Sequence, residues 1–406
     1  MAVLTGTEGP DKEGATLARV DLTGADVIDA HSHPFRTQDL LDRDPRTFET
    51  RCMFLGTALL SSNHANHEAA SFVEELTETT MFGLALRRWM AAHLGCEPTK
   101  EAVVAARDAA LRADSPGYIR ALLGSERVVA VVADEGYPQP TIPREDFEAA
   151  LGGVPVHRVG RIETWIVDAR EEGTFNGTVQ RFEEAVNVAG GDPRLIAYKT
   201  IIAYRTGLDV TDPSPGEAAA AYDRWRADGW RETREHAKPV RDFLLRRAFV
   251  LAKEHDRVFH VHVGAGDPDV NLTHARPQDA FAFFVEHQDI PVVMIHSGWP
   301  WVAEATYVGT VLPNVYLDLS ELVPWGWGQI DWSLEMILGS VPAAKVLHGS
   351  DQSSEPEMHP VSARLVRQAL ERVLGTFVDR DFLSVADAES IGRGVLAGNV
   401  RRLHGI

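Results

Sequence analysis

The feature that most constrains the fold is an alternation of short β-branched runs with amphipathic stretches. Stretches such as Val240–His255 carry apolar residues three and four positions apart, which is typical of helices. The strand candidates are Asp26–Ala30, Val128–Ala133, Val156–Ile162, Leu195–Lys199, Val258–Val263, Pro291–Ile295, Val315–Leu319 and Lys345–Leu347. Eight strands alternating with helices predict a parallel sheet that closes into a (β/α)₈ TIM barrel. An open doubly wound sheet fits the same periodicity, but no Gly-x-Gly-x-x-Gly turn follows the first strand.

Two gaps between strand candidates are too long for simple loops. We expect a helical insertion after the first strand, at about 36–126, because stretches such as Phe72–Leu94 have helical periodicity. In a barrel this insertion would lie over the mouth, where lids are common. The second gap, Tyr204–Pro239, is interpreted as an excursion on the same face. We therefore predict an N-terminal extension at 1–25 and a single barrel domain at 26–406.

The composition limits the partners and the compartment. Forty Lys and Arg against 59 Asp and Glu give a formal net charge of -19, which disfavours nucleic acid and anionic membranes as partners. No run of eighteen apolar residues is present, and the first twenty residues lack the apolar core of a signal peptide. The two cysteines, Cys52 and Cys96, cannot build a disulfide framework or a cysteine zinc site. We expect a cytoplasmic enzyme that acts on a small molecule.

Ionisable residues end nearly every strand candidate. The carboxyl ends of barrel strands meet at one mouth, so these residues are expected to lie together. His31 and His33 follow the first strand, and two histidines spaced i, i+2 on an extended segment can reach one metal ion.

The later strands add further metal-ligand candidates. His262 is preferred over His260 because it lies nearer the strand end, and His260 is interpreted as a packed barrel residue. The sixth strand ends at His296 and the eighth at Asp351, while the fourth supplies Lys199. Imidazoles with a carboxylate make a site for one or two divalent ions, with zinc favoured and manganese or iron as alternatives.

Such a site predicts hydrolytic chemistry. A divalent cation lowers the pKa of a bound water and polarises a carbonyl oxygen. Asp351 can then bind the metal and take the proton of the attacking water. His296, where it is not a ligand, can act as acid or base or stabilise the developing oxyanion.

The sequence resembles the amidohydrolase superfamily of metal-dependent barrel enzymes. It is most similar to the amidohydrolase-like domain that is fused to glutamine-synthetase-like domains in nodulin-type proteins. The resemblance covers the chain from Asp26 onward and rests on several motifs in the expected order. These are DAHSHP (29–34), VGRIET (159–164), YKTIIAYRTGLDV (198–210), HVGAGDPD (262–269), IHSGWP (295–300), NVYLDLS (314–320) and KVLHGSD (345–351).

The resemblance implies a ligand set. Carried over residue by residue, the metal ligands would be His31, His33, His262 and Asp351. His296 would be catalytic in a single-metal enzyme and a ligand in a two-metal enzyme, where a carboxylated Lys199 would bridge the ions. Lys199 can instead form an ion pair with Glu163 or contact an anionic substrate, and the sequence leaves these alternatives open.

Five further residues are candidates for substrate binding. Glu163 ends the third strand, where a salt-bridge network is the alternative role. Arg205 can clamp a carboxylate, or it can be a surface arginine at a helix start. Trp299, Trp325 and Trp327 suggest an aromatic or apolar part of the substrate, or they pack under the helical insertion.

Three functions follow in order of preference. The first is hydrolysis of a carbon–nitrogen bond, in an amide that is γ-glutamyl or aromatic, by metal-activated water. The second is metal-dependent decarboxylation of an aromatic acid, and the third is an inactive barrel scaffold. A homo-oligomer is common for soluble proteins of this size, although the sequence shows no interface signature.

Overall fold

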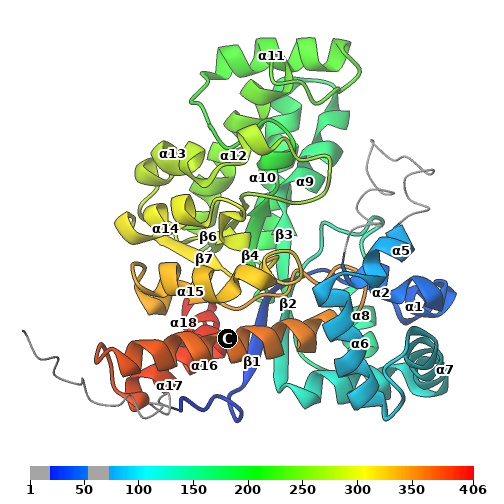
Figure 1. The fold of residues 1–406 in the computed structure, drawn as a ribbon. Coiled ribbons are helices and arrows are strands. Elements are labelled where there is room, and N and C mark those ends of the chain that lie inside the picture. The colour runs from blue at the N-terminus through cyan, green and yellow to red at the C-terminus, as the bar shows by residue number, and fades with distance from the viewer. Residues whose placement is uncertain (1–18, 54–72) are drawn as a thin grey trace, which may run out of the picture.

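A parallel eight-stranded sheet forms the centre of the molecule, which is described by a computed structural model (Figure 1). The structure describes residues 19–53 and 73–406. The strands follow one another in chain order around the sheet. Their bounds are β1 Val27–Ser32, β2 Val128–Asp134, β3 Val156–Arg161, β4 Leu195–Thr200, β5 Val258–His262, β6 Val292–Ile295, β7 Val315–Asp318 and β8 Val346–Leu347.

Contacts between the first and last strands complete the barrel. Ala30 N donates to His348 O at 2.8 Å, Asp351 N donates to His31 O at 2.8 Å, and Ser32 forms an isolated parallel bridge with Gln352. The predicted (β/α)₈ barrel is confirmed, and the doubly wound alternative is excluded because such a sheet would leave β1 and β8 apart.

Helices separate and cover the strands. They are α1 Thr37–Asp42, α2 Phe48–Cys52, α5 Val73–Glu78, α6 Met81–Leu94, α7 Lys100–Ser125, α8 Arg144–Ala150, α9 Ile162–Ala169, α10 Phe175–Gly190, α11 Pro215–Ala227, α12 Ala237–Glu254, α13 Phe281–Glu286, α14 Val302–Val311, α15 Ile330–Leu338, α16 Met358–Asp379, α17 Val385–Arg393 and α18 Asn399–His404. The helices between β1 and β2 form the expected insertion, and Figure 1 shows α5, α6 and α7 gathered on one side of the barrel. Residues 1–18 of the predicted extension and 54–72 of the insertion lie outside the described residues.

The stretch Phe72–Leu94, which has helical periodicity, contains two helices in its described part, residues 73–94. Thr80 has extended backbone angles, and its side chain accepts a hydrogen bond from Gly83 N, so it caps the start of α6. Threonine favours this position because its hydroxyl satisfies a backbone N–H that has no partner within the helix. The segment therefore folds as α5 and α6 with a break between them.

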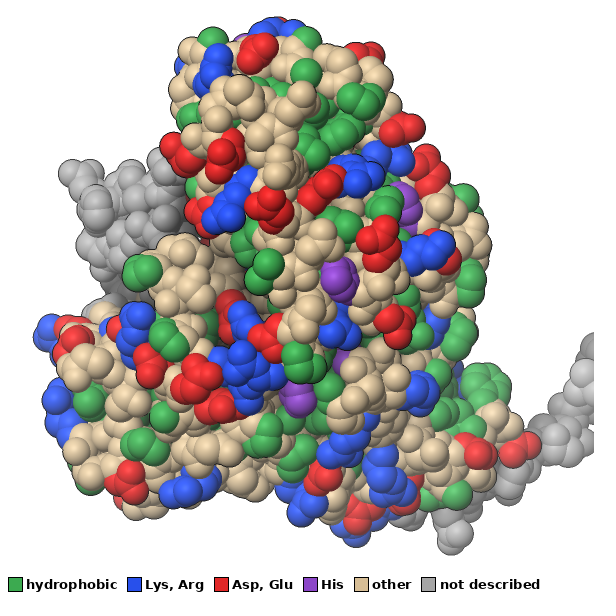
Figure 2. Space-filling view, turned by 180° about the vertical axis from the view of Figure 1, so that it is seen from behind, with side chains coloured by type: hydrophobic (Ala, Val, Ile, Leu, Met, Phe, Trp, Pro, Cys, Tyr) green, Lys and Arg blue, Asp and Glu red, His purple; other side chains and the backbone are tan. Residues whose placement is uncertain are grey.

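Within the second excursion, the helix α11 belongs to the outer helical layer. α11 packs against α10 and α12 at the far end of the molecule in Figure 1. Ser214 caps α11 together with Glu217, which explains the turn-rich sequence before it. On the face drawn in Figure 2, Lys and Arg side chains lie among Asp and Glu side chains. Within the described residues, no helix has the length and apolar character that crossing a bilayer requires.

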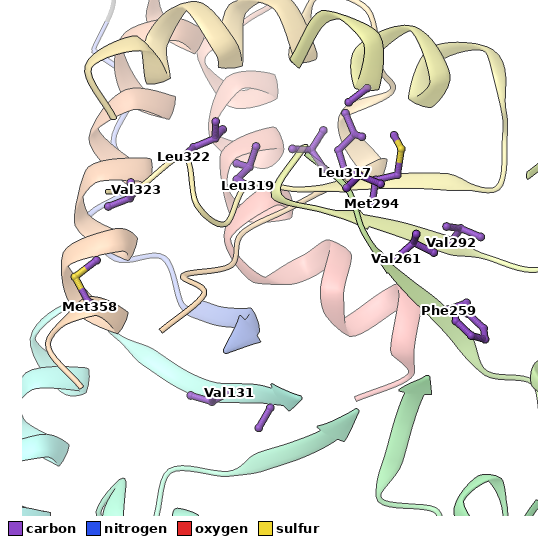
Figure 3. Close-up of a cluster of buried hydrophobic side chains, with 14 of the residues drawn as sticks. Val131, Phe259, Val261, Val292, Met294, Leu317, Leu319, Leu322, Val323 and Met358 are labelled. Atoms are coloured by element: carbon purple, nitrogen blue, oxygen red, sulfur yellow. The ribbon is translucent and has the colours of Figure 1, made fainter. Parts of the chain in front are cut away.

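Strand residues alternate between two apolar clusters. Phe259 and Val261 belong to the large cluster between the strands and the helices, together with Val292 and Met294 (Figure 3). Val293 and Ile295 belong to the smaller cluster inside the barrel. Since successive side chains of a strand point to opposite faces, His260 and His262 share the inward face of β5. This alternation directs the side chains of His260 and His262 into the barrel.

Candidate metal centre

Residues at the carboxyl ends of five strands line one cavity of about 640 Å³. His31 comes from β1, His33 from the residue after β1, Lys199 from β4, His262 from β5, His296 from the residue after β6, and Asp351 from the loop after β8. Residues of the insertion, including Arg43 and Arg51, form part of the wall. The structure thus brings all six metal-ligand candidates of the sequence analysis together.

Asp351 joins the two histidines at the end of β1, His31 and His33. Its Oδ1 lies 3.1 Å from His31 Nε2 and 3.4 Å from His33 Nε2. His31, His296 and Asp351 each offer a ligand atom within 4.8 Å of the others. His262 Nδ1 lies 3.0 Å from His296 Nε2, so His262 extends the same cluster.

These donors fit a divalent metal. Ligand bonds of about 2.0–2.1 Å at a tetrahedral ion place neighbouring donor atoms roughly 3.3 Å apart, close to the spacing of Asp351 from His31 and His33. His262 Nε2 is buried and has no hydrogen-bond partner among the described residues. A buried nitrogen without a partner is costly, and a metal ion is one group that would satisfy it.

The protonation states favour metal binding as well. Burial lowers the pKa of His31 to about 4, and it lowers the pKa values of His262 and His296 well below the usual range. Burial alone would raise the pKa of Asp351, but His296 and the hydrogen bonds from His31 and His33 hold it well below its usual range. The cluster therefore presents neutral imidazoles and a carboxylate, which are the forms that bind metals.

Lys199 contacts the cluster rather than Glu163. Its Nζ lies 3.0 Å from His31 Nε2 and 3.9 Å from Asp134 Oδ2. Glu163 accepts a 2.6 Å hydrogen bond from the Thr200 hydroxyl and does not line the cavity. Lys199 therefore does not form the ion pair with Glu163. Its position beside His31 is the position that a lysine would need in order to bridge two metal ions or to contact the substrate.

A buried carboxylate that the sequence analysis did not single out supports the cluster from behind. Asp29 Oδ1 accepts from Ser350 N at 2.8 Å and from His31 N at 3.3 Å, and Asp29 Oδ2 lies 2.6 Å from His359 Nδ1. Asp29 thereby links β1 to the loop that carries Asp351. Its place two residues before His31 is the signal that could have identified it.

The aromatic candidates separate into two groups. Trp325 lines the cavity together with Tyr137 and Tyr204, and its Nε1 donates to Met53 O at 3.1 Å. Trp299 packs against Trp325 with ring centroids 6.0 Å apart, and neither Trp299 nor Trp327 lines the cavity. Trp327 packs against Phe82 of α6, with ring centroids 6.2 Å apart, as expected for a tryptophan under the insertion.

Glu321, after β7, is a second site residue that sequence reasoning missed. It lines the cavity, is buried, and places Oε1 3.7 Å from His296 Nε2. Burial, reinforced by Asp351 and Asp267, raises its pKa well above the usual range. Its position after a strand, like that of the other site residues, was the available signal.

The chain is similar to a known protein family over more than half of its length. The family model described as "Amidohydrolase" matches residues 177–406. The protein fluG of Emericella nidulans is 28% identical over 332 residues, which are 75% of this chain and 38% of fluG. The chain therefore spans well under half the length of that relative.

Solved structures share the fold over nearly the whole chain. A putative metal-dependent hydrolase from Lactobacillus casei superposes with a TM-score of 0.79 at 23% identity, covering 96% of this chain and 98% of the other. Uronate isomerase from Thermotoga maritima superposes with a TM-score of 0.66 at 12% identity, covering 93% and 94%. At these identities the likeness shows the fold and nothing narrower.

Proposed function

The chain belongs to the amidohydrolase family, and on that premise we propose that it hydrolyses an amide-type carbon–nitrogen bond of a small molecule at a divalent metal centre. The family makes it a hydrolase-type, metal-dependent enzyme; the bond, the substrate and zinc as the metal are the proposal. The observation that carries it is the cluster of His31, His33, His296 and Asp351 at the closed end of the cavity.

The metal would be held by His31, His33 and Asp351, with His262 or His296 as a further ligand. When bound, it would polarise the substrate carbonyl and make water a stronger acid. The reaction adds the water oxygen to the carbonyl carbon, breaks the C–N bond and releases an acid and an amine.

The side chains of the site supply the proton transfers. The carboxylate of Asp351 is placed to accept the proton of the attacking water, and the amine leaves with a proton. Glu321, 3.7 Å from His296 Nε2, lies where it can deliver that proton. His296 is oriented by Ser320 Oγ at 2.9 Å from Nδ1 and by His262 at 3.0 Å from Nε2, so its ring has little freedom to turn.

The resemblance to barrels fused with glutamine-synthetase-like domains supports a γ-glutamyl amide as the substrate, and the aromatic wall supports an aromatic amide. Both features are met by a γ-glutamyl anilide. The cavity, about 640 Å³, is within the range for such small molecules.

The test combines metal analysis with product detection. We expect the purified protein to contain at least one equivalent of zinc or a related transition metal and to release aniline from γ-glutamyl anilide. Asp351→Asn should abolish both metal retention and turnover. A metal-free protein without turnover would overturn the proposal and favour the scaffold.

Decarboxylation of an aromatic acid is the second candidate. Trp325, Tyr137 and Tyr204 in the cavity wall favour it, because an aromatic acid would pack against them. Release of CO₂ from hydroxybenzoates, without amine release from amides, would select this function instead.

A further inference from the structure

The cavity wall carries both signs of charge, and most of its cations already have a carboxylate partner. Arg43 Nη1 lies 3.2 Å from Glu355 Oε1, and Arg51 also pairs with Glu355. Arg161 Nη2 lies 2.6 Å from Asp134 Oδ2, and Lys199 shares the same carboxylate at 3.9 Å. Each of these four cations therefore has a carboxylate partner, although Glu355 and Asp134 are each shared by two of them.

Arg205 differs from the other cationic residues of the wall. In the part of the chain that the structure describes, no carboxylate lies within ion-pair distance of its guanidinium, and no hydrogen bond holds its side chain. The carboxylates of Glu163 and Glu232 attract this guanidinium only from beyond ion-pair distance, and the charge of Arg241 repels it. Its side chain is half-buried, and burial lowers its pKa.

A half-buried guanidinium without a partner is an unbalanced charge. Burying an unpaired charge is unfavourable, and the side chain gains by pairing when an anion arrives. The planar fork of arginine matches a carboxylate with two parallel hydrogen bonds. Since Arg205 lines the same cavity as the metal-ligand cluster, a bound anion would share that cavity with the reacting group.

We propose that Arg205 binds a carboxylate of the substrate, so that the enzyme acts on acidic amides whose carboxylate is remote from the bond to be cleaved. This rests on the proposed hydrolysis for the place of the reaction, but the carboxylate site itself can be tested without turnover.

The charges around the site favour a carboxylate over a phosphate ester. One unpaired guanidinium balances one negative charge, whereas Asp267 and Asp269 in the same cavity oppose a dianion. Burial and neighbouring Asp351 raise the pKa of Asp267 to about 6, as expected where negative charge is already concentrated.

Binding of simple acids to the metal-loaded protein tests the proposal. Calorimetry would compare butyrate with the dicarboxylates from succinate to adipate. One carboxylate can occupy the metal-ligand cluster, and only a dicarboxylate has a second one for Arg205. We expect at least one dicarboxylate to bind tenfold or more tightly than butyrate. Arg205→Met should remove that difference and change butyrate binding less than twofold, and Arg205→Lys should give an intermediate affinity.

Arg43→Met is the matched comparison, since Arg43 lines the same cavity but is paired with Glu355. It should change dicarboxylate affinity less than threefold. An equal loss of dicarboxylate affinity in Arg43→Met and Arg205→Met would overturn the proposal. It would show that the dicarboxylate is attracted by the overall charge of the cavity wall and not by a specific contact with Arg205. The proposal would also be overturned by an Arg205→Met protein that binds the dicarboxylate normally, or by tighter binding of 4-phosphonobutyrate than of glutarate. Absence of amide hydrolysis with dicarboxylate binding intact would reject the proposed function and leave the carboxylate site standing.

Discussion

At the scale of single residues, the site is built on backbone conformations that side chains usually avoid. His296 (φ 74°), Ser297 (φ 46°), Glu321 (φ 58°) and Asp351 (φ 54°) all have positive φ values. Such residues cost of order 1–3 kcal/mol each and persist only where the surroundings hold them. Here Asp318 accepts hydrogen bonds from Ser297 Oγ at 2.6 Å and from His296 N at 3.3 Å. The fold thus stabilises the strained turn at His296, whose side chain lines the cavity with those of Glu321 and Asp351.

Glu321 gives the first prediction. Glu321→Gln keeps the size of the side chain but cannot exchange a proton with the leaving amine. General acid catalysis contributes roughly 10²–10⁴-fold, so we expect kcat to fall at least about 100-fold while the bound metal per protein stays unchanged. Steady-state kinetics and elemental analysis measure the two quantities. A loss of metal would show instead that Glu321 is a ligand.

At the scale of elements, the loops after β5 and β6 are in close backbone contact. Gly264 has φ +85°, and a Cβ there would lie 2.4 Å from Trp299 O. Gly95, after α6, has φ +67°, but a Cβ at that position would meet no group of the described residues within 4 Å. Both alanine variants carry about 1–2 kcal/mol of backbone strain, and Gly264→Ala adds about 1–3 kcal/mol of overpacking. Thermal melting should therefore show the larger loss for Gly264→Ala, and equal losses would contradict the close packing of the two loops.

A buried charge network connects the insertion to the loop after β8. Arg107 of α7 donates from Nε to Glu357 at 2.6 Å and from Nη2 to Glu355 at 2.5 Å, and both glutamates are buried. Arg107→Met leaves these carboxylates under-compensated, so we expect the free energy of unfolding to fall by about 3–5 kcal/mol. Chemical denaturation measures this loss.

The same helix offers the control for that measurement. Arg112 pairs with Asp108 on the surface of α7, and Arg112→Met should leave the unfolding midpoint unchanged because exposed pairs contribute little. If Arg107→Met behaved like Arg112→Met, the network would not hold the insertion to the barrel.

At the scale of the whole molecule, the barrel was predictable because its strands are buried on both faces. Such strands appear as β-branched runs, and the predicted runs Val128–Ala133 and Leu195–Lys199 each end within one residue of β2 and β4. The convergence of strand ends then located His31, His262 and Asp351 in one cavity before any distance was known.

Some features of the site could not be predicted from the sequence because they depend on particular contacts in the folded protein. The register of β1 is irregular between Asp29 and Ser32, and irregularities of this kind re-aim side chains near active sites. If side chains alternated regularly along β1, His31 would lie on the same face of the sheet as Val27 and Asp29. Likewise, only the ion pairs of Arg161 and Arg43 distinguish them from Arg205, and sequence cannot show which arginine is left without a partner.

Metal removal tests the molecule as a whole. The ligand candidates come from β1, β5, β6 and β8, so an ion bound among them ties opposite sides of the barrel together. An ion that binds only the folded state stabilises it by about 4 kcal/mol at a free concentration 1,000 times its Kd. We expect a chelator to lower the melting temperature by several degrees, and added zinc to restore it in proportion to the logarithm of its concentration. Asp351→Asn, which lacks the carboxylate shared by His31 and His33, should melt at a temperature that neither treatment changes. A wild-type protein whose melting temperature is equally insensitive to both treatments would show that these side chains hold no ion.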